Sequence, residues 1–223
     1  MIRVKIIVEG QTEELFVNKV MANHLMSRQI YLYPWVVGKP GSKGGVPKWT
    51  KAKRDILITL KQDRECICTI MFDYYGMPSC WPGRREATGK LPTRASQIVQ
   101  EAIATDIQQE LGTSFNAGRF LPYVQMHEFE ALLFSGPEIL ARTLGRLDLT
   151  DDFTTIRQQF PNPEQIDDGP HTAPSKRIIQ LCEAYSKGTD GALAAQNIGL
   201  DAIRVQCPNF NNWLSAIESL AAH

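Results

Sequence analysis

Several features that mark particular protein classes are missing from this sequence. Its 223 residues carry no net charge, because 24 lysines and arginines balance 24 aspartates and glutamates. Proteins with strong non-specific affinity for DNA are usually more basic, so any nucleic-acid contact must come from a local patch. The five cysteines are odd in number and form no CxxC pair, which argues against a disulfide framework and a zinc site.

Targeting and membrane signals are also missing. No apolar stretch reaches the roughly 18 residues that a membrane span needs, and "MIRVKIIVEG" is too short for a secretory signal. We therefore expect a cytoplasmic protein with no membrane partner. The hydrophobic content of 43% is ample for a folded core, which excludes a disordered chain.

Apolar runs alternate with helical patterns through the first half of the chain. The runs rich in β-branched residues predict strands at 3–9, 30–37, 66–73 and 119–125. Pro34 weakens the second strand or places it at a sheet edge. The intervening patterns predict helices that begin with Thr12 as N-cap, span about 51–62, and span 93–111. This alternation predicts an α/β fold with a parallel sheet flanked by helices.

After Gln125 the pattern becomes helical. The stretches "HEFEALLF", "PEILARTL", "APSKRIIQLCEAY" and "NFNNWLSAIESLAAH" all have helical character. We therefore predict an α/β core at 1–126 and a helical C-terminal region at 127–223 that packs on the core.

Two predicted strands end in carboxylates, Glu9 after the first and Asp73 at the end of the third. In an open parallel sheet, ligands bind outside the carboxyl ends of the strands, where these two acids can meet. Two neighbouring acids repel each other unless one is protonated or a cation neutralises both, and hard oxygen ligands suit Mg²⁺ or Mn²⁺. The alternative is that each acid caps a following helix, although Thr12 already takes that position after the first strand.

The segments "VEGQTEE" and "FDYYGMP" resemble the Toprim fold of topoisomerases, primases and OLD-type nucleases. Together with "HEFEALLF", "APSKRI" and "CPNFNNWL", they resemble more closely an uncharacterised prokaryotic family of Toprim-like proteins. The resemblance implies a metal-dependent nuclease, with Glu9 as metal ligand or general base and Asp73 as the main metal ligand. It also implies a setting in anti-phage defence beside an ATPase. Because the chain has no G-x-x-x-x-G-K-[ST] motif, that ATPase would be a separate protein.

The chain departs from the Toprim pattern at Tyr75, which stands where a second aspartate belongs. Either a third carboxylate comes from elsewhere, with Glu128 and Glu130 as the candidates, or the metal is held weakly. Helical spacing places His127 and Glu130 on one face, where His127 could donate to a phosphate or orient a water. The alternatives are a structural histidine, and a Glu128 that only complements a helix dipole.

The segment "TAPSKR" places Lys176 and Arg177 at a predicted helix start, where cations oppose the helix dipole. A bound phosphate would relieve this conflict, and Lys176 would then stabilise the transition-state charge. Asp167 or Asp168 could relieve it as well.

Two basic loops flank the predicted acids. We expect the cationic side chains of both loops to contact a nucleic-acid backbone, with DNA favoured over RNA: Lys39, Lys43, Lys48, Lys51, Arg84 and Arg85. Trp49 lies among them as a candidate for base stacking. The alternative is a pair of solvated loops.

These features support two main hypotheses. The first is a metal-dependent nuclease that hydrolyses phosphodiester bonds. The second is a catalytically inactive scaffold or regulatory partner of an ATPase, in which Tyr75 reflects a lost metal site. A nucleotide-binding or phosphotransfer protein that shares only the strand-end acids is a third.

Overall fold

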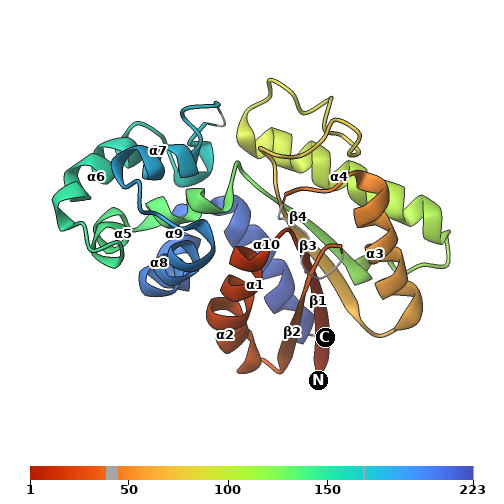
Figure 1. Ribbon diagram of the computed structural model, residues 1–223. Helices are drawn as coiled ribbons and strands as arrows, with labels where there is room; N and C mark the ends of the chain where they lie inside the picture. The colour runs from red at the N-terminus through yellow and green to blue at the C-terminus, as the bar shows by residue number, and fades with distance from the viewer. Residues whose placement is uncertain (39–44, 168, 223) are drawn as a thin grey trace.

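The computed structural model describes residues 1–38, 45–167 and 169–222. In these residues four parallel strands form one sheet in the order β2-β1-β3-β4. The strands are β1 (Ile2–Val8), β2 (Ile30–Val36), β3 (Ile67–Asp73) and β4 (Phe120–Gln125). Figure 1 shows the sheet in the middle of the molecule with helices on both sides. The predicted α/β class is confirmed, and each strand lies within one residue of its expected bounds.

The direction of the crossovers decides which face each helix covers. The β1–β2 connection runs toward one edge of the sheet, through α1 (Gln11–Phe16), a π-helical turn and α2 (Ala22–Met26). The β2–β3 connection contains α3 (Trp49–Gln62) and runs in the opposite direction, past β1. The β3–β4 connection contains α4 (Pro92–Leu111) and continues in that same direction. Right-handed crossovers in opposite directions place their helices on opposite faces. Accordingly α1 and α2 lie on one face, and α3 and α4 lie on the other (Figure 1).

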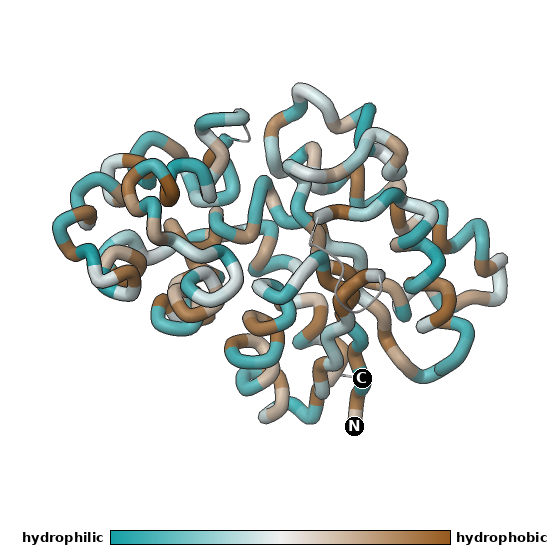
Figure 2. The backbone as a smooth tube through the Cα atoms, in the orientation of Figure 1, coloured by the Kyte–Doolittle hydropathy of each residue, from teal (hydrophilic) through white to brown (hydrophobic). Residues whose placement is uncertain are grey.

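Two hydrophobic clusters form the core, one on each face of the sheet. Val4, Ile6 and Val8 of β1 point into the larger cluster, whereas Ile7 points into the cluster under α3 and α4. A strand with apolar residues on both sides suits a sheet covered on both faces. Figure 2 shows the corresponding concentration of hydrophobic residues along the central strands.

The helices after β4 are α5 (Pro137–Thr143), α6 (Thr150–Gln158), α7 (Pro174–Leu181), α8 (Ala192–Ile198), α9 (Leu200–Gln206) and α10 (Pro208–Ser219). Short 3-10 helices span Ala117–Arg119, Phe129–Ser135, Leu147–Leu149, Pro163–Gln165 and Leu220–Ala222, and π-helical turns span Val17–Met21 and Lys187–Gly191. Trp213 of α10 stacks on Tyr123 of β4 with ring centroids 4.3 Å apart, and its indole donates to Thr69 Oγ1 at 2.8 Å. These helices therefore share the larger cluster with the sheet, and the division at residue 126 stays a prediction. None of the described helices is long and apolar enough to cross a membrane.

Two local expectations were wrong. The first helix begins at Gln11 with Gly10 as its N-cap, and Thr12 instead donates to the carbonyl of Lys187 at 3.2 Å. "HEFEALLF" is helical only from Phe129, as a 3-10 helix, so His127 precedes the helix and does not share a helical face with Glu130. Both differences arise because tertiary contacts, not local pattern, determine where these short helices start.

Candidate functional site

Glu9 and Asp73 meet at the carboxyl end of the sheet, as the parallel topology predicts. Glu9 directly follows β1, Asp73 is the last residue of β3, and these two strands are neighbours. The Glu9 carboxylate accepts a hydrogen bond from the Asp73 backbone N–H at 3.4 Å. The strand order reverses at this point, because β1 connects toward one edge and β3 toward the other. The pair therefore occupies the position at which α/β sheets bind ligands.

The acids at this edge are poorly compensated. Burial raises the pKa of Asp73 well above its usual range, and the charge of Glu9 raises it further. Burial, followed by the charge of Glu13, raises the pKa of Glu9 to about 7. Both shifts have the cause expected when carboxylates share a desolvated site. A cation placed here would therefore be bound favourably.

Glu13 is a member of this cluster that the sequence reasoning missed. Its side chain is buried, and its carboxylate accepts from the Gly10 N–H at 2.9 Å. Burial raises its pKa, and its charge raises the pKa values of Glu9 and Asp73 in turn. In the sequence a glutamate in a first helical turn looks like ordinary dipole complementarity, so only its burial reveals the difference.

Lys187 is the second residue missed, and it contacts two of the predicted acids. Its ammonium lies 3.1 Å from Glu128 and 3.5 Å from Glu130. Burial disfavours its charge, but Glu130 and Glu128 together raise the pKa of Lys187. Glu130 is fully buried and also accepts from the Tyr185 hydroxyl at 3.3 Å. Burial, opposed by Lys187, raises the pKa of Glu130 to about 7.

Glu128 takes the place that the sequence reasoning assigned to a phosphate. Its carboxylate accepts from the Ser175 backbone N–H at 2.9 Å and from the Ser175 hydroxyl at 3.1 Å, at the start of α7. Arg177 donates to the Thr172 carbonyl and lies 3.7 Å from Asp167. An internal anion therefore satisfies this helix start, and Asp168 lies outside the described residues.

Lys176 lies exposed in the first turn of α7. The lysine that contacts the acids Glu128 and Glu130 is Lys187. His127 is buried, packs edge-on against Tyr74 at 5.8 Å between ring centroids, and accepts at its carbonyl from the Tyr75 N–H. Tyr75 itself is exposed beside Asp73.

The two predicted basic loops lie beside each other. The indole of Trp81 in the second loop donates to the Pro47 carbonyl in the first at 2.7 Å. Of the cations predicted to contact nucleic acid, Lys48, Lys51 in the first turn of α3, and Arg85 are exposed, while Lys39 and Lys43 lie outside the described residues.

Two of the residues predicted to contact nucleic acid, Arg84 and Trp49, instead make contacts within the fold. Arg84 covers the Tyr74 ring at 4.0 Å and donates to its hydroxyl at 2.9 Å. The expectation that Trp49 stacks on bases was wrong, because Trp49 is buried against Trp81 and bonds to Asp106.

The donor chemistry at the sheet edge fits a hard divalent cation. Glu9 and Asp73 offer carboxylate oxygens in a negatively charged environment, which is what Mg²⁺ and Mn²⁺ prefer. Across residues 1–38, 45–167 and 169–222, no three His, Cys, Asp or Glu side chains are arranged to hold one ion. Glu130, the expected third ligand, is engaged by Lys187 and Tyr185. The remaining ligand candidates are therefore Glu9 and Asp73.

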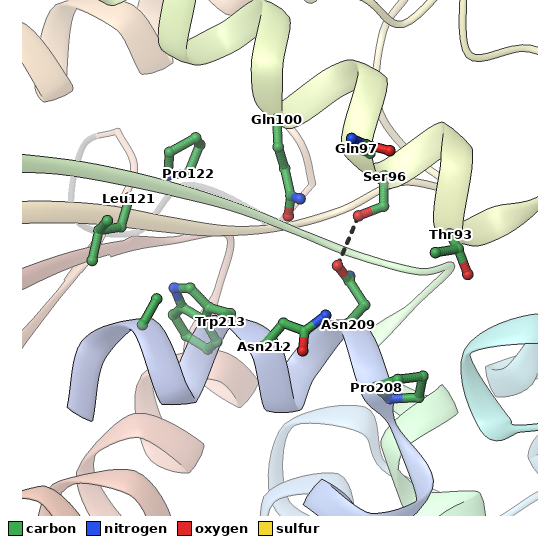
Figure 3. A pocket seen from close by; sticks show the side chains of 11 residues that line it. Thr93, Ser96, Gln97, Gln100, Leu121, Pro122, Pro208, Asn209, Asn212 and Trp213 are labelled. Carbon is green, nitrogen blue, oxygen red and sulfur yellow. Dashed lines mark hydrogen bonds between the residues drawn. The ribbon is translucent and has the colours of Figure 1, made fainter. Parts of the chain in front are cut away.

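A pocket of about 400 Å³ lies elsewhere, at the open edge of β4 between α4 and α10 (Figure 3). The polar side chains that line this pocket make hydrogen bonds within the fold. Gln100 accepts from the Val124 N–H at 3.0 Å, Asn209 donates to the Val124 carbonyl at 2.9 Å, and Ser96 donates to Asn209. These amides cover the edge of β4, which would otherwise present unpaired backbone groups.

Residues 8–218 match the family model described as Domain of unknown function (DUF4276). The chain belongs to the DUF4276 family. This membership confirms the resemblance to a family of unknown function. No curated protein matches this DUF4276 chain.

Among solved structures, the DUF4276 chain is similar to the C-terminal regions of two OLD proteins. The region from Burkholderia pseudomallei is 15% identical with a TM-score of 0.49, and the match covers 99% of each chain. The region from Xanthomonas campestris pv. campestris is 18% identical with a TM-score of 0.41, covering 100% of this chain and 97% of the other. At these identities and TM-scores the similarity carries no conclusion about activity.

Proposed function

We propose that this DUF4276 protein is a metal-dependent phosphodiesterase of Toprim type that acts on nucleic acid, with DNA preferred over RNA. One observation carries the proposal. Glu9, Glu13, Asp73 and Glu130 gather at the carboxyl ends of the strands, where burial raises the pKa of each and the charges of neighbouring carboxylates raise those of Glu9, Asp73 and Glu130 further. Burying uncompensated carboxylates is costly, and a divalent cation offsets that cost directly.

In this proposal Glu9 and Asp73 hold Mg²⁺ or Mn²⁺. The bound ion would polarise the phosphate and make a water molecule a better nucleophile. Lys187, through its ammonium held by Glu128 and Glu130, would stabilise the negative charge that develops on the phosphate. Glu13 would orient Gly10 and add negative potential behind Glu9. Glu130 would support Lys187 and join the ion only if Lys187 moves away.

The proposal also names the partners of the chain. Lys48, Lys51 and Arg85 would contact the phosphate backbone beside the acids. A separate ATPase would act with the chain in the cytoplasm, in defence against phage.

The test is a nicking assay with purified protein, supercoiled plasmid and Mn²⁺ or Mg²⁺, with and without a co-encoded ATPase. Glu9→Gln and Asp73→Asn should each lower the rate at least about a hundredfold, because each removes several kcal/mol of charge stabilisation. Glu138→Gln, at an exposed site on α5, is the matched control and should cut normally. Absence of cleavage of the plasmid, and of an RNA substrate tested in parallel, by the wild-type protein under all these conditions would refute the proposal.

A scaffold role is the second candidate, and Tyr75 favours it, since a neutral tyrosine is a poor ligand for Mg²⁺. In that case the protein should protect cells from phage equally well with Glu9→Gln and Asp73→Asn. Loss of protection in both variants would exclude the scaffold role.

A further inference from the structure

The edge strand β2 exposes three aromatic side chains on one of its faces. Tyr33 and Trp35 are 50% and 49% exposed, and Tyr31, two residues earlier, is partly exposed. Residues two apart on a strand point to the same face, so these three rings form one row, here called the β2 aromatic row. A row of large exposed aromatics is unusual on a protein surface and indicates a contact site.

The topology explains why this row is uncovered. The opposite face of β2, with Ile30 and Leu32, packs in the larger core cluster under α1 and α2. On the side of the aromatic row, α3 packs over β1 and β3, where Ile7 and Ile70 join its cluster. Because α3 crosses back past β1, the described helices on that side cluster with β1, β3 and β4 and not with β2.

Basic side chains of β1 lie beside the aromatic rings of β2. Lys5 is the register partner of Tyr33, and its ammonium lies 4.7 Å from the centroid of Trp35. Arg3 is the register partner of Tyr31 and pairs with Asp63 at 3.0 Å. Aromatic rings that alternate with cations bind the bases and the phosphates of single-stranded nucleic acid, respectively.

The spacing of the rings favours an extended single strand. Alternate residues on a strand are about 6.6–6.8 Å apart, twice the rise per residue. This is roughly twice the 3.4 Å repeat of stacked nucleotides along one DNA strand, so bases must separate to stack on successive rings. A duplex does not offer its base faces in this way.

The row also leads toward the acidic site. Trp35 is the register partner of Ile7, and Glu9 follows two residues later, at the same end of the sheet. We propose that the β2 aromatic row, together with Lys5, binds single-stranded nucleic acid by base stacking and directs it toward Glu9 and Asp73. The claim that the bound strand is a substrate rests on the proposed function, whereas the claim that the β2 aromatic row binds single-stranded nucleic acid does not.

Binding can be measured apart from cleavage. A fluorescein-labelled oligo(dT) strand is titrated with full-length protein in EDTA, and anisotropy gives the dissociation constant. Tyr33→Ala and Trp35→Ala should each weaken binding roughly five- to a hundredfold, the range for loss of one stacked base. Tyr33→Phe and Trp35→Phe keep the rings and should keep most of the affinity. Lys5→Gln should make the dependence of log K on log salt shallower by about 0.7.

Trp35 gives a direct readout of the contact. The other tryptophans, Trp49, Trp81 and Trp213, are buried, so quenching of tryptophan fluorescence by oligo(dT) reports on Trp35. Leu147→Ala, at an exposed apolar site outside the row, is the control and should change neither signal.

Each of the following results would overturn the inference: equal affinity in the alanine variants, no quenching on binding, or tighter binding of duplex than of oligo(dT). A shift from dimer to monomer in Trp35→Ala, with oligo(dT) binding unchanged, would also overturn it and identify an interface between copies. Ring-dependent binding without any metal-dependent cleavage would refute only the nuclease proposal. Metal-dependent cleavage that is insensitive to the rings would refute only this inference.

Discussion

Glu130 should make the metal-free protein less stable as pH rises, and the size of the effect can be estimated. Its pKa is 4.5 in an unfolded chain and about 7 in the fold, because the side chain is buried. Each tenfold change in proton affinity is worth about 1.4 kcal/mol, so ionised Glu130 costs the fold about 3 kcal/mol. Lys187 opposes this cost and is already included in the shifted value.

The sign follows from proton linkage. Between the unfolded pKa and the folded pKa, the native state binds more protons than the unfolded state, so stability falls as pH rises. The contribution is complete below 4.5 and is lost as pH passes through about 7. Glu130→Gln removes this titration, so its stability relative to wild type should improve by about 2–3 kcal/mol between pH 5 and pH 8.

Urea unfolding in EDTA at several pH values measures this difference. Glu138→Gln serves as control, because this carboxylate is 64% exposed and pairs with Arg142 one turn later. Its effect should stay within about 0.5 kcal/mol at every pH. A Glu130→Gln difference that does not vary with pH would refute the reasoning, as would one that grows in the opposite direction.

Two further predictions concern cations around the site. Lys187→Met should lower metal-dependent cleavage by roughly a hundred- to a thousandfold, as loss of a charge-stabilising group does. Lys176→Met should leave cleavage nearly unchanged. Equal losses of cleavage by the two variants in a nicking assay would contradict the assignment of Lys187. Arg84→Met should cost about 1–3 kcal/mol in urea unfolding by removing the cation–π contact and hydrogen bond to Tyr74. The neighbouring Arg85→Met should cost almost nothing, and similar losses in both variants would show that Arg84 has no special role in the fold.

The strands and the pairing of their terminal acids could be predicted because their signals are local. A β-branched apolar run that ends in a carboxylate marks both the strand and its end, and the parallel topology then brings Glu9 and Asp73 together. Pro34 likewise predicted an edge strand, because a proline lacks the N–H that a central strand needs.

The rest of the site depends on contacts between distant residues. Lys187 lies 57 positions after Glu130 in a glycine-containing π-helical turn, and no spacing rule links the two. Burial distinguishes Glu13 from an ordinary first-turn glutamate. It also distinguishes Trp49, which is buried, from Trp35, which is half exposed. Sequence composition could place a tryptophan among lysines, but only the packing of Trp49 against Trp81 shows that its ring is unavailable.

The acidic cluster and the β2 aromatic row have one topological origin. The chain moves from β1 to β2 at one edge, then reverses and returns past β1 to β3. The reversal places a switch between β1 and β3, where the helical connections diverge and the Glu9 carboxylate lies against the Asp73 backbone N–H. The same reversal carries α3 inward, away from β2, so that within the described part of the chain the cluster under α3 contains no residue of β2. In the proposal above, a nucleic-acid strand lying along β2 would run toward the end of the sheet at which Glu9 follows β1, because Trp35 is the register partner of Ile7.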